Sequence, residues 1–355
     1  MTALIEPLRL NLGATSAAPI IPPLSESVSI DCVETTDADE QAQLLRKWDQ
    51  TYDQISLGRF SGKTTGIWFN DFQIFREVTN QSVHECGTAW AGSHTFGIPI
   101  AMSGNACFRS CAMGPDMMLS LGEYSELDFR TPQYLDIVGV SFKSDWIEDY
   151  VRTVEGWAVD RRLGGRDLIA VRHDRMVALC GFMNLIFEMI DERPALLDYA
   201  NARATLRQAI VVNVFGAIDE ADGDAQKIVS WRSHAAVVDR AKSYILSHPF
   251  EAVTIAELCL KIGVSRRRLQ YSFQETLDTS PIQYLRAIRL DRVRRELKKI
   301  TDDTTGVQDV AARWGFWHLG HFSTDYKRMF GESPSATLRA GRARRKYLAS
   351  SSIVP

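Results

Sequence analysis

The sequence has few cysteines and no long hydrophobic run. Its 6 cysteines are spread irregularly over 355 residues, and a chain of this length can bury a large core without cross-links, so a disulfide scaffold is excluded. The longest apolar stretches, around 177–190 and 209–218, fall short of the roughly 20 residues that a membrane-spanning helix needs. Residues 1–23 have no basic cluster before an apolar segment, so we expect no secretory signal. These features predict a cytoplasmic protein with reduced thiols and no membrane partner.

Motifs that accompany many enzyme active sites are also missing. The chain has no glycine-rich phosphate loop and no GxSxG nucleophile elbow. A metal-dependent cupin site needs paired histidines with a following glutamate, whereas His84 and His94 are isolated in the sequence. Cys107 and Cys111 lack the second pair that a cysteine metal site needs. Cys86 adjoins a histidine and a glutamate, but neighbours in a strand point to opposite faces, so adjacency builds no catalytic dyad.

We therefore predict that the protein is not an enzyme, holds no metal and needs no cofactor to fold. The alternative is a cupin-type metal-dependent enzyme fused to a DNA-binding tail.

Charge divides the chain into two parts. The net charge is -3, but residues 235–348 carry 21 Lys and Arg against 12 Asp and Glu, and the rest carries 20 against 32. An acidic module is therefore followed by a basic one. We place domain boundaries where composition and pattern change: an arm at 1–35 that we expect to be mobile, a first domain at 36–225, a linker at 226–234 and a basic domain at 235–348.

The acidic module shows a strand pattern followed by a helix pattern. Short apolar segments separated by turns run from 66 to 142 and predict an antiparallel β-sandwich or barrel of cupin type. Helical periodicity follows at 144–154, 173–191 and 195–220, where Leu206, Ile210 and Val214 share one side. That side must pack on a helix of the same chain or of a second subunit. Trp90, His94 and Phe96 either line an effector pocket or belong to the sheet core.

The basic module begins with a helix-turn-helix pattern. Thr254 and Glu257 form a capping box, and Gly263 can end the helix in a left-handed conformation. The next helix, 266–277, has an apolar side and an opposite side with groups able to reach base edges. The outward residues are Arg267, Gln270, Tyr271 and Gln274.

The pattern recurs about 50 residues later. Thr305 and Gln308 form a second possible capping box, and Gly315 ends the helix. In 317–330, one face is apolar and aromatic, and the opposite face carries His318, His321, Thr324, Asp325 and Arg328. The sequence thus predicts an α+β protein whose C-terminal, all-α domain has two helix-turn-helix units.

A long helix joins the two units. It begins at Ser280-Pro281 and runs to about Lys299, so it spans about 28 Å. Major grooves on one face of DNA repeat at roughly 34 Å, so a rigid connector of this length would let both units enter adjacent grooves. We expect phosphate contacts from Arg286, Arg289, Arg292, Arg294, Arg295, Lys298 and Lys299, and beyond the connector from Arg342, Arg344, Arg345 and Lys346.

Residues 237–338 resemble the AraC/XylS family of bacterial transcription regulators. The residues that match the family signature are Ala311, Gly315, Phe316, His321, Phe322, Phe330, Gly331 and Pro334. The resemblance implies binding to double-stranded promoter DNA, often with activation through RNA polymerase. Carried over by position, it implies one base-reading set of Arg266, Arg267, Gln270 and Tyr271 and a second of His318, His321 and Thr324. Because Leu319 and Gly320 replace residues that are often polar, we expect the second helix to read fewer bases, and His321 either contacts a base or packs at the turn.

The acidic module is similar to a narrower group of regulators. The segment 48–82 and the sequence FGIPI resemble regulators of ethanolamine-utilisation operons and of other amine and amino-acid catabolism. This resemblance implies a small-molecule effector, with ethanolamine and adenosylcobalamin as candidates. We expect a homodimer whose residues 36–225 sense the effector and control a catabolic operon.

Overall fold

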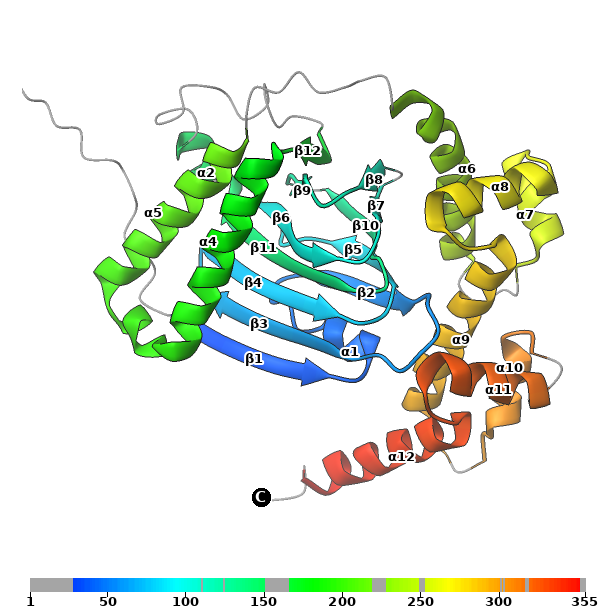
Figure 1. Ribbon diagram of the computed structural model, residues 1–355. Coiled ribbons are helices and arrows are strands. Elements are labelled where there is room, and N and C mark those ends of the chain that lie inside the picture. Colours follow the sequence, from blue (N-terminus) through cyan, green and yellow to red (C-terminus); the bar gives the residue numbers. More distant parts are fainter. Residues whose placement is uncertain are drawn as a thin grey trace, which may run out of the picture.

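The computed structural model describes residues 28–109, 111–123, 125–150, 166–218, 228–248, 253–300, 302, 304–316 and 319–351. Two β-sheets lie face to face, with long helices on one side and a separate group of helices on the other (Figure 1). Among these residues, no helix combines the length and the apolar content that crossing a bilayer requires.

Every strand pairing in the two sheets is antiparallel. The larger sheet has the order β1 (Ser29–Thr35), β3 (Gly62–Trp68), β4 (Phe72–Thr79), β11 (Leu135–Lys143), β6 (Ser93–Met102), β9 (Met117–Leu121) and β12 (Leu168–Ala170). The smaller has the order β2 (Asp49–Gln54), β5 (Val83–Thr88), β10 (Glu126–Arg130), β7 (Ala106–Phe108) and β8 (Cys111–Met113). The predicted α+β fold with an antiparallel sandwich is confirmed, as two sheets rather than a closed barrel.

Helices cover the outer face of the larger sheet. They are α2 (Ser144–Tyr150), α4 (His173–Glu192), the 3-10 helix η2 (Pro194–Asp198) and α5 (Ala200–Ala217). In β4, Phe72 and Ile74 belong to the core shared with these helices, so the alternate residues Phe75 and Glu77 point towards the smaller sheet. Ile210 is fully buried in the same core, so the apolar side of α5 packs within its own chain.

The structure differs from the sequence-based boundaries at two places. Residues 29–35, assigned above to a mobile arm without a fold, form the edge strand β1, which pairs with β3 along its whole length. Helix α6 (Ile228–Ser247) begins inside the segment 226–234 that was expected to be a linker.

Of the possible pocket residues, Phe96 is fully buried in the core, and His94 Nε2 lies 2.9 Å from Ser120 Oγ. Burial lowers the pKa of His94 to about 4.

The C-terminal helices form two small cores that share one long helix. The elements are α6, α7 (Ile255–Ile262), α8 (Arg266–Leu277), α9 (Pro281–Lys299), α10 (Val307–Arg313), α11 (Leu319–Phe330) and α12 (Pro334–Ser351). Leu285 and Ile288 of α9 pack in the first core with α6, α7 and α8. Leu290, Val293 and Leu297 pack in the second with α10, α11 and α12. Helix α9 is therefore the rigid connector that the sequence predicts, with 19 residues.

Candidate DNA-binding surface and its contacts with the N-terminal domain

The first helix-turn-helix unit forms as the sequence predicts. Thr254 and Glu257 make a reciprocal capping box at the start of α7, and Gly263 ends it at a φ of 69°. Ser265 then caps α8, because its Oγ accepts a hydrogen bond from the Arg268 N–H at 3.2 Å. Leu269 and Phe273 are fully buried, which fixes the rotation of α8 about its axis.

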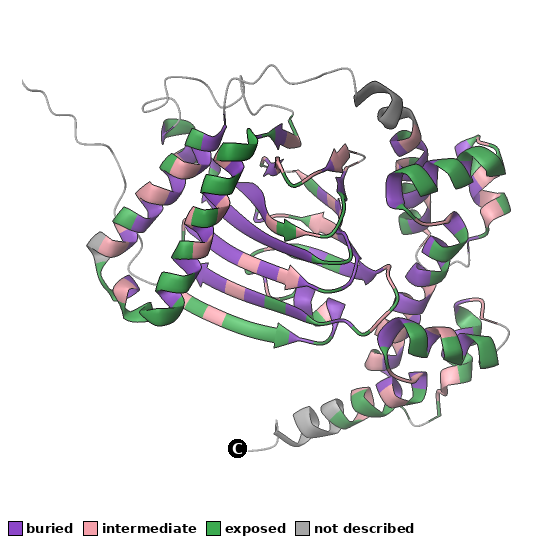
Figure 2. Cartoon of the chain, in the orientation of Figure 1, coloured by how far each residue is buried: buried purple, intermediate pink, exposed green. Residues whose placement is uncertain are grey.

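That rotation exposes the polar side of α8. The exposed residues include all five that were predicted to contact DNA from this helix: Arg266, Arg267, Gln270, Tyr271 and Gln274. The last four of them, together with Ser265 and Arg268, line an open hollow of about 560 Å³. Exposed residues follow the outer side of α8 in Figure 2. Guanidinium, amide and phenol groups side by side can hydrogen-bond to phosphates and to base edges.

The second unit is built on α10 and α11. His321 and Thr324 are exposed on α11, while Phe322 and Tyr326 are buried. The Thr324 hydroxyl donates to the Gly320 carbonyl at 3.0 Å. His318, the remaining predicted contact, lies outside the described residues. Of the proposed reading positions, α11 therefore presents two and α8 presents five.

The cap of α10 differs from the expected Thr305–Gln308 box. Gly306 is the N-cap residue, and its N–H donates to the Asp309 carboxylate at 2.7 Å. The Asp302 carboxylate accepts the Thr305 N–H at 2.6 Å, so Thr305 belongs to the preceding turn. The Asp309 carboxylate, three residues after Gly306, is a stronger acceptor for a backbone N–H than the neutral amide of Gln308. Asp309 therefore completes the cap in place of Gln308.

The basic side chains of α9 do not form the phosphate-binding surface that the sequence suggests, because most of them are bound within the protein. Arg294 Nη2 lies 3.0 Å from Asp37 Oδ2, and Arg295 lies 2.6 Å from Asp39 Oδ1 and 2.7 Å from Asp53 Oδ1. Lys298 pairs with the same two N-terminal aspartates, Asp37 and Asp39. These acids belong to β2, to the short helix α1 (Ala38–Ala42) and to its N-cap. The cause is electrostatic: carboxylates of the acidic module already neutralise these cations, so they are not available to phosphates.

The remaining predicted phosphate contacts also have partners or are not described. Arg286 pairs with Asp325, Arg289 and Arg292 donate to the carbonyls of Val253 and Ile245, and Arg342 donates to the carbonyls of Asp302 and Thr305. Lys299 is exposed. The side chains of Arg344, Arg345 and Lys346 lie outside the described residues. Within the described part of the chain, Lys299 is thus the one predicted phosphate contact of α9 that makes no hydrogen bond or ion pair through its side chain.

Charge pairing shifts the pKa values of Asp37 and Arg295 at this contact. Burial would raise the pKa of Asp37, but Lys298 and Arg294 outweigh that effect and lower it. Burial would likewise lower the pKa of Arg295, whereas Asp53 and Asp39 raise it. Asp37 and Arg295 thus keep their charges at neutral pH. We call this group of residues the α9 contact: Asp37, Asp39, Asp53, Arg294, Arg295 and Lys298.

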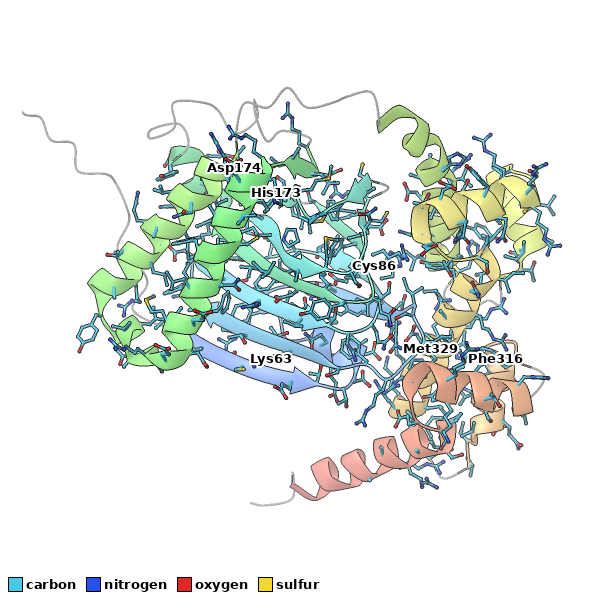
Figure 3. All side chains as sticks on the ribbon, in the orientation of Figure 1. Lys63, Cys86, His173, Asp174, Phe316 and Met329 are labelled. Atoms are coloured by element: carbon cyan, nitrogen blue, oxygen red, sulfur yellow. The ribbon has the colours of Figure 1, made fainter. Side chains whose placement is uncertain are left out.

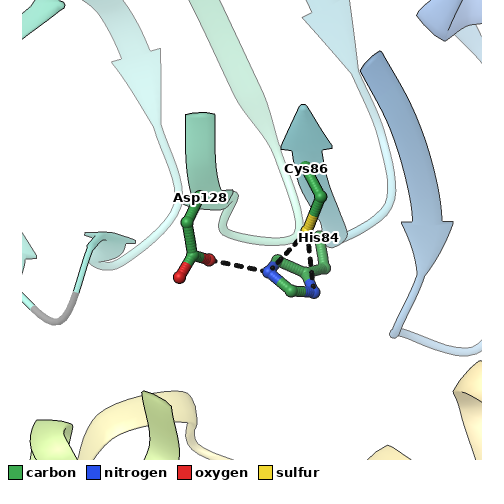
Figure 4. Close-up of side chains that lie close together, drawn as sticks. All are labelled: His84, Cys86 and Asp128. Atoms are coloured by element: carbon green, nitrogen blue, oxygen red, sulfur yellow. Dashed lines mark hydrogen bonds and ion pairs between the residues drawn. The ribbon is translucent and has the colours of Figure 1, made fainter. Parts of the chain in front are cut away.

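A second contact joins the outer face of the smaller sheet to α6 and α9. His84 Nε2 lies 2.7 Å from Asp128 Oδ1, and His84 Nδ1 lies 2.9 Å from the Tyr284 hydroxyl. Lys242 Nζ of α6 donates to the same Asp128 oxygen at 2.8 Å. Cys86 Sγ lies 3.1 Å from His84 Nε2 (Figure 4). The signal in the sequence is the spacing of two between His84 and Cys86, because residues two apart in a strand share a face.

This cluster has the geometry of a possible metal site but not its chemistry. One ligand atom from each of His84, Cys86 and Asp128 lies within 4.8 Å of the others. Burial raises the pKa of the Cys86 thiol, however, so the thiolate that binds metals is disfavoured. The Lys242 ammonium already occupies the Asp128 oxygen. Burial lowers the pKa of His84, so a neutral imidazole can donate to Asp128 and accept from Tyr284. The arrangement is therefore a hydrogen-bonded connection between domains.

A third contact reaches the second helix-turn-helix unit. Gln54 Nε2 and the Gly58 N–H both donate to the Met329 carbonyl of α11, at 2.8 and 3.2 Å. Cys86 and Met329 lie on the sides of the two domains that face each other (Figure 3). The N-terminal domain therefore contacts α6, the connecting helix α9 and the second unit.

Two helix-turn-helix units on one connecting helix, with exposed polar side chains on the second helix of each, define a DNA-binding domain. Residues 258–340 match the family model described as a helix-turn-helix domain. A segment of 103 residues is 40% identical to the probable thc operon regulatory protein of Rhodococcus erythropolis, covering 29% of this chain and 31% of that protein. A segment of 100 residues is 32% identical to XylDLEGF operon transcriptional activator 2 of Pseudomonas putida, covering 28% of this chain and 64% of that protein.

Among solved structures, a probable AraC family transcriptional regulator from Rhodopseudomonas palustris is 34% identical, covering 30% of this chain and 98% of that chain, with a TM-score of 0.28. The C-terminal domain is therefore similar to the helix-turn-helix domains of bacterial operon regulators. The matched segments span less than two thirds of both curated relatives. These relatives are regulators, and each match covers less than a third of this chain. Their names refer to other operons than ethanolamine utilisation, so the narrower resemblance is not supported.

Proposed function

We propose that this protein is a transcription regulator of the bacterial cytoplasm that binds promoter DNA through α8 and α11. The observation that carries the proposal is the side of α8 that faces solvent, where five predicted contact residues are exposed together. Arg267 can donate two guanidinium N–H groups to one guanine, and Gln270 can pair with adenine. Since the connector cations are bound within the protein, we assign sequence reading mainly to α8, with α11 as a second anchor.

A binding assay with matched variants tests this proposal. Fluorescence anisotropy with DNA from the protein's own upstream region measures the Kd at several salt concentrations. Arg267→Ala removes a base contact, so we expect the Kd to rise about 5- to 150-fold. Lys63→Ala, on the N-terminal sheet, also removes an exposed cation and leaves the Kd unchanged. Equal affinities of both variants, or binding that does not weaken as salt rises, contradict the proposal.

We further propose that residues 36–225 form a sensing and dimerisation domain. Support for dimerisation comes from α4, whose outer side carries the exposed apolar residues Val177, Leu185 and Met189. Support for signalling comes from the three contacts with the DNA-binding domain, because an effector that favours another arrangement of the first domain would change them. Contact with RNA polymerase and control of a catabolic operon remain implications of the family.

The identity of the effector requires a direct measurement. Ethanolamine and adenosylcobalamin are candidates only through the resemblance of residues 48–82. Calorimetric titration of the intact protein with each compound and with both together tests that pair. The absence of heat in all three titrations excludes it and leaves the DNA-binding proposal unaffected.

A further inference from the structure

Two glutamates face each other in the interior of the N-terminal domain. Glu77 of β4 points towards the smaller sheet, and its Oε2 accepts a hydrogen bond from the Tyr52 hydroxyl of β2 at 3.0 Å. Glu85 of β5 is paired directly with Tyr52 in the sheet, so both side chains lie on the same face. The two carboxyl groups thus point from opposite sheets into the interior of the sandwich.

Neither glutamate has a cationic partner among the residues that the structure describes. Glu77 is 4% exposed, and its other oxygen accepts from Gln41 Nε2 at 2.9 Å. Glu85 is 7% exposed and accepts no hydrogen bond from the described part of the chain. Burial raises the pKa of Glu77 to about 7, and burial together with the nearby Glu77 raises the pKa of Glu85. Two buried carboxylates without a cation are costly to ionise.

Further polar atoms of this interior lack partners. The Gln50 side chain is oriented by its Nε2, which donates to the Ala42 carbonyl at 3.1 Å and to the Tyr52 hydroxyl at 3.2 Å. This leaves Gln50 Oε1 buried without a hydrogen bond in the described structure. Trp48 Nε1 is buried without a partner there too, and the indole packs edge-on against Phe75 with centroids 5.7 Å apart. Buried polar atoms are normally paired, so this set points to a polar ligand.

We propose that Glu77, Glu85 and Gln50 bind the ammonium group of a small primary amine between the two sheets. An ammonium group has three N–H donors, which match two carboxylates and one amide oxygen. Its positive charge offsets the cost of ionising both glutamates, and the rings of Tyr52 and Trp48 provide the aromatic wall that organic cations favour. A divalent metal fits less well, because both Glu77 oxygens already accept hydrogen bonds and a hard cation needs about six oxygen ligands.

This inference rests on the proposed function and names the chemical class of the effector. Isothermal titration of the intact protein compares ethanolamine and ethylamine with ethylene glycol, a neutral molecule of similar size. We expect saturable heat with the amines and none with the glycol. Because amine binding favours the ionised carboxylates, binding at pH 7 releases protons, so the heat differs between phosphate and Tris buffers. The affinity should rise from pH 6 to pH 8, while the amine itself stays protonated.

Charge-neutral variants separate binding from folding. Glu85→Gln keeps the shape and removes one charge, so we expect about 10- to 100-fold weaker amine binding without a lower melting temperature. Glu34→Gln is the control, because Glu34 is an exposed residue of β1. It also loses one negative charge, and its long ion pair with Lys63, at 3.9 Å, lies on the surface. Saturable heat with neither amine, equal binding of the glycol, binding of Mg²⁺ in place of amines, or unchanged affinity in Glu85→Gln overturns the inference.

DNA binding of the same preparation distinguishes this inference from the proposed function. Protein that binds promoter DNA but no amine contradicts only the ligand assignment. Protein that binds an amine but no DNA supports the ligand assignment and contradicts the proposed regulator.

Discussion

The α9 contact should restrain DNA binding, and Asp39→Asn is the variant that tests this. Asp39 lies in the N-terminal domain and contacts Arg295 at 2.6 Å and Lys298 at 3.3 Å, so its substitution leaves the DNA-binding domain itself unchanged. Both partners are partly buried, where hydrogen bonds between charged groups contribute about 1.5–3 kcal/mol each. An asparagine still accepts one hydrogen bond, so we expect the docked arrangement to weaken by about 2 kcal/mol.

The expected effect on DNA affinity follows from this free energy. If the docked arrangement is the major state and binds DNA poorly, 2 kcal/mol corresponds to about a 30-fold shift of the equilibrium. The Kd for promoter DNA should therefore fall by up to about 30-fold, and amide exchange in α9 should become faster. Anisotropy titrations and hydrogen-exchange mass spectrometry measure the two effects independently.

Asp49→Asn is the matched control for this experiment. Asp49 is an exposed aspartate of β2 in the same domain, and the described residues place no cation of α9 against it. The reasoning is refuted if both variants have the wild-type Kd and the wild-type exchange in α9. A higher Kd in Asp39→Asn alone would instead show that docking supports DNA binding.

Three further predictions concern folding, assembly and pH. Phe273→Ala, in the fully buried core of the first unit, should lower the free energy of unfolding by about 3–5 kcal/mol in chemical denaturation; a change below 1 kcal/mol would contradict the burial argument. Leu185→Glu places a charge on the exposed apolar side of α4, so light scattering should show a folded monomer, and a persistent dimer would place the interface elsewhere. The pKa values of Asp37 and Asp128 are lowered in the folded protein, so their stabilising contribution is complete above their unfolded pKa near 4 and is lost as pH falls through the lowered values. Acid unfolding of Asp128→Asn should therefore be less steep below pH 4 than that of the wild type, whereas an identical profile would show that this carboxylate is not coupled to folding.

Local features of the DNA-binding domain could be predicted well from the sequence. The Thr254–Glu257 box, the left-handed Gly263 and the apolar side of α8 all depend on residues within a few positions of each other. Strand β1 was missed because its short alternating pattern follows a segment rich in Ala, Pro, Ser and Thr, and a strand at a sheet edge is defined mainly by its neighbour.

The candidate sites depended more on distant parts of the chain. In the His84–Cys86–Asp128 cluster, the hydrogen-bonded residues His84 and Asp128 lie on two strands and are 44 residues apart in sequence. The other partners of the cluster come from α6 and α9. The glutamates of the interior look like ordinary polar residues of strands, and nothing local shows that Glu77 and Glu85 point into the same space. Their burial is a property of the stacked sheets.

The sequence by itself determined that this chain has a basic domain of two helix-turn-helix units with an exposed polar helix face, because caps, periodicity and charge are short-range properties. Only the tertiary structure decided which cations are available to DNA. Electrostatic pairing acts between groups that folding brings together, and Arg294, Arg295 and Lys298 lie more than 200 residues from the aspartates that neutralise them.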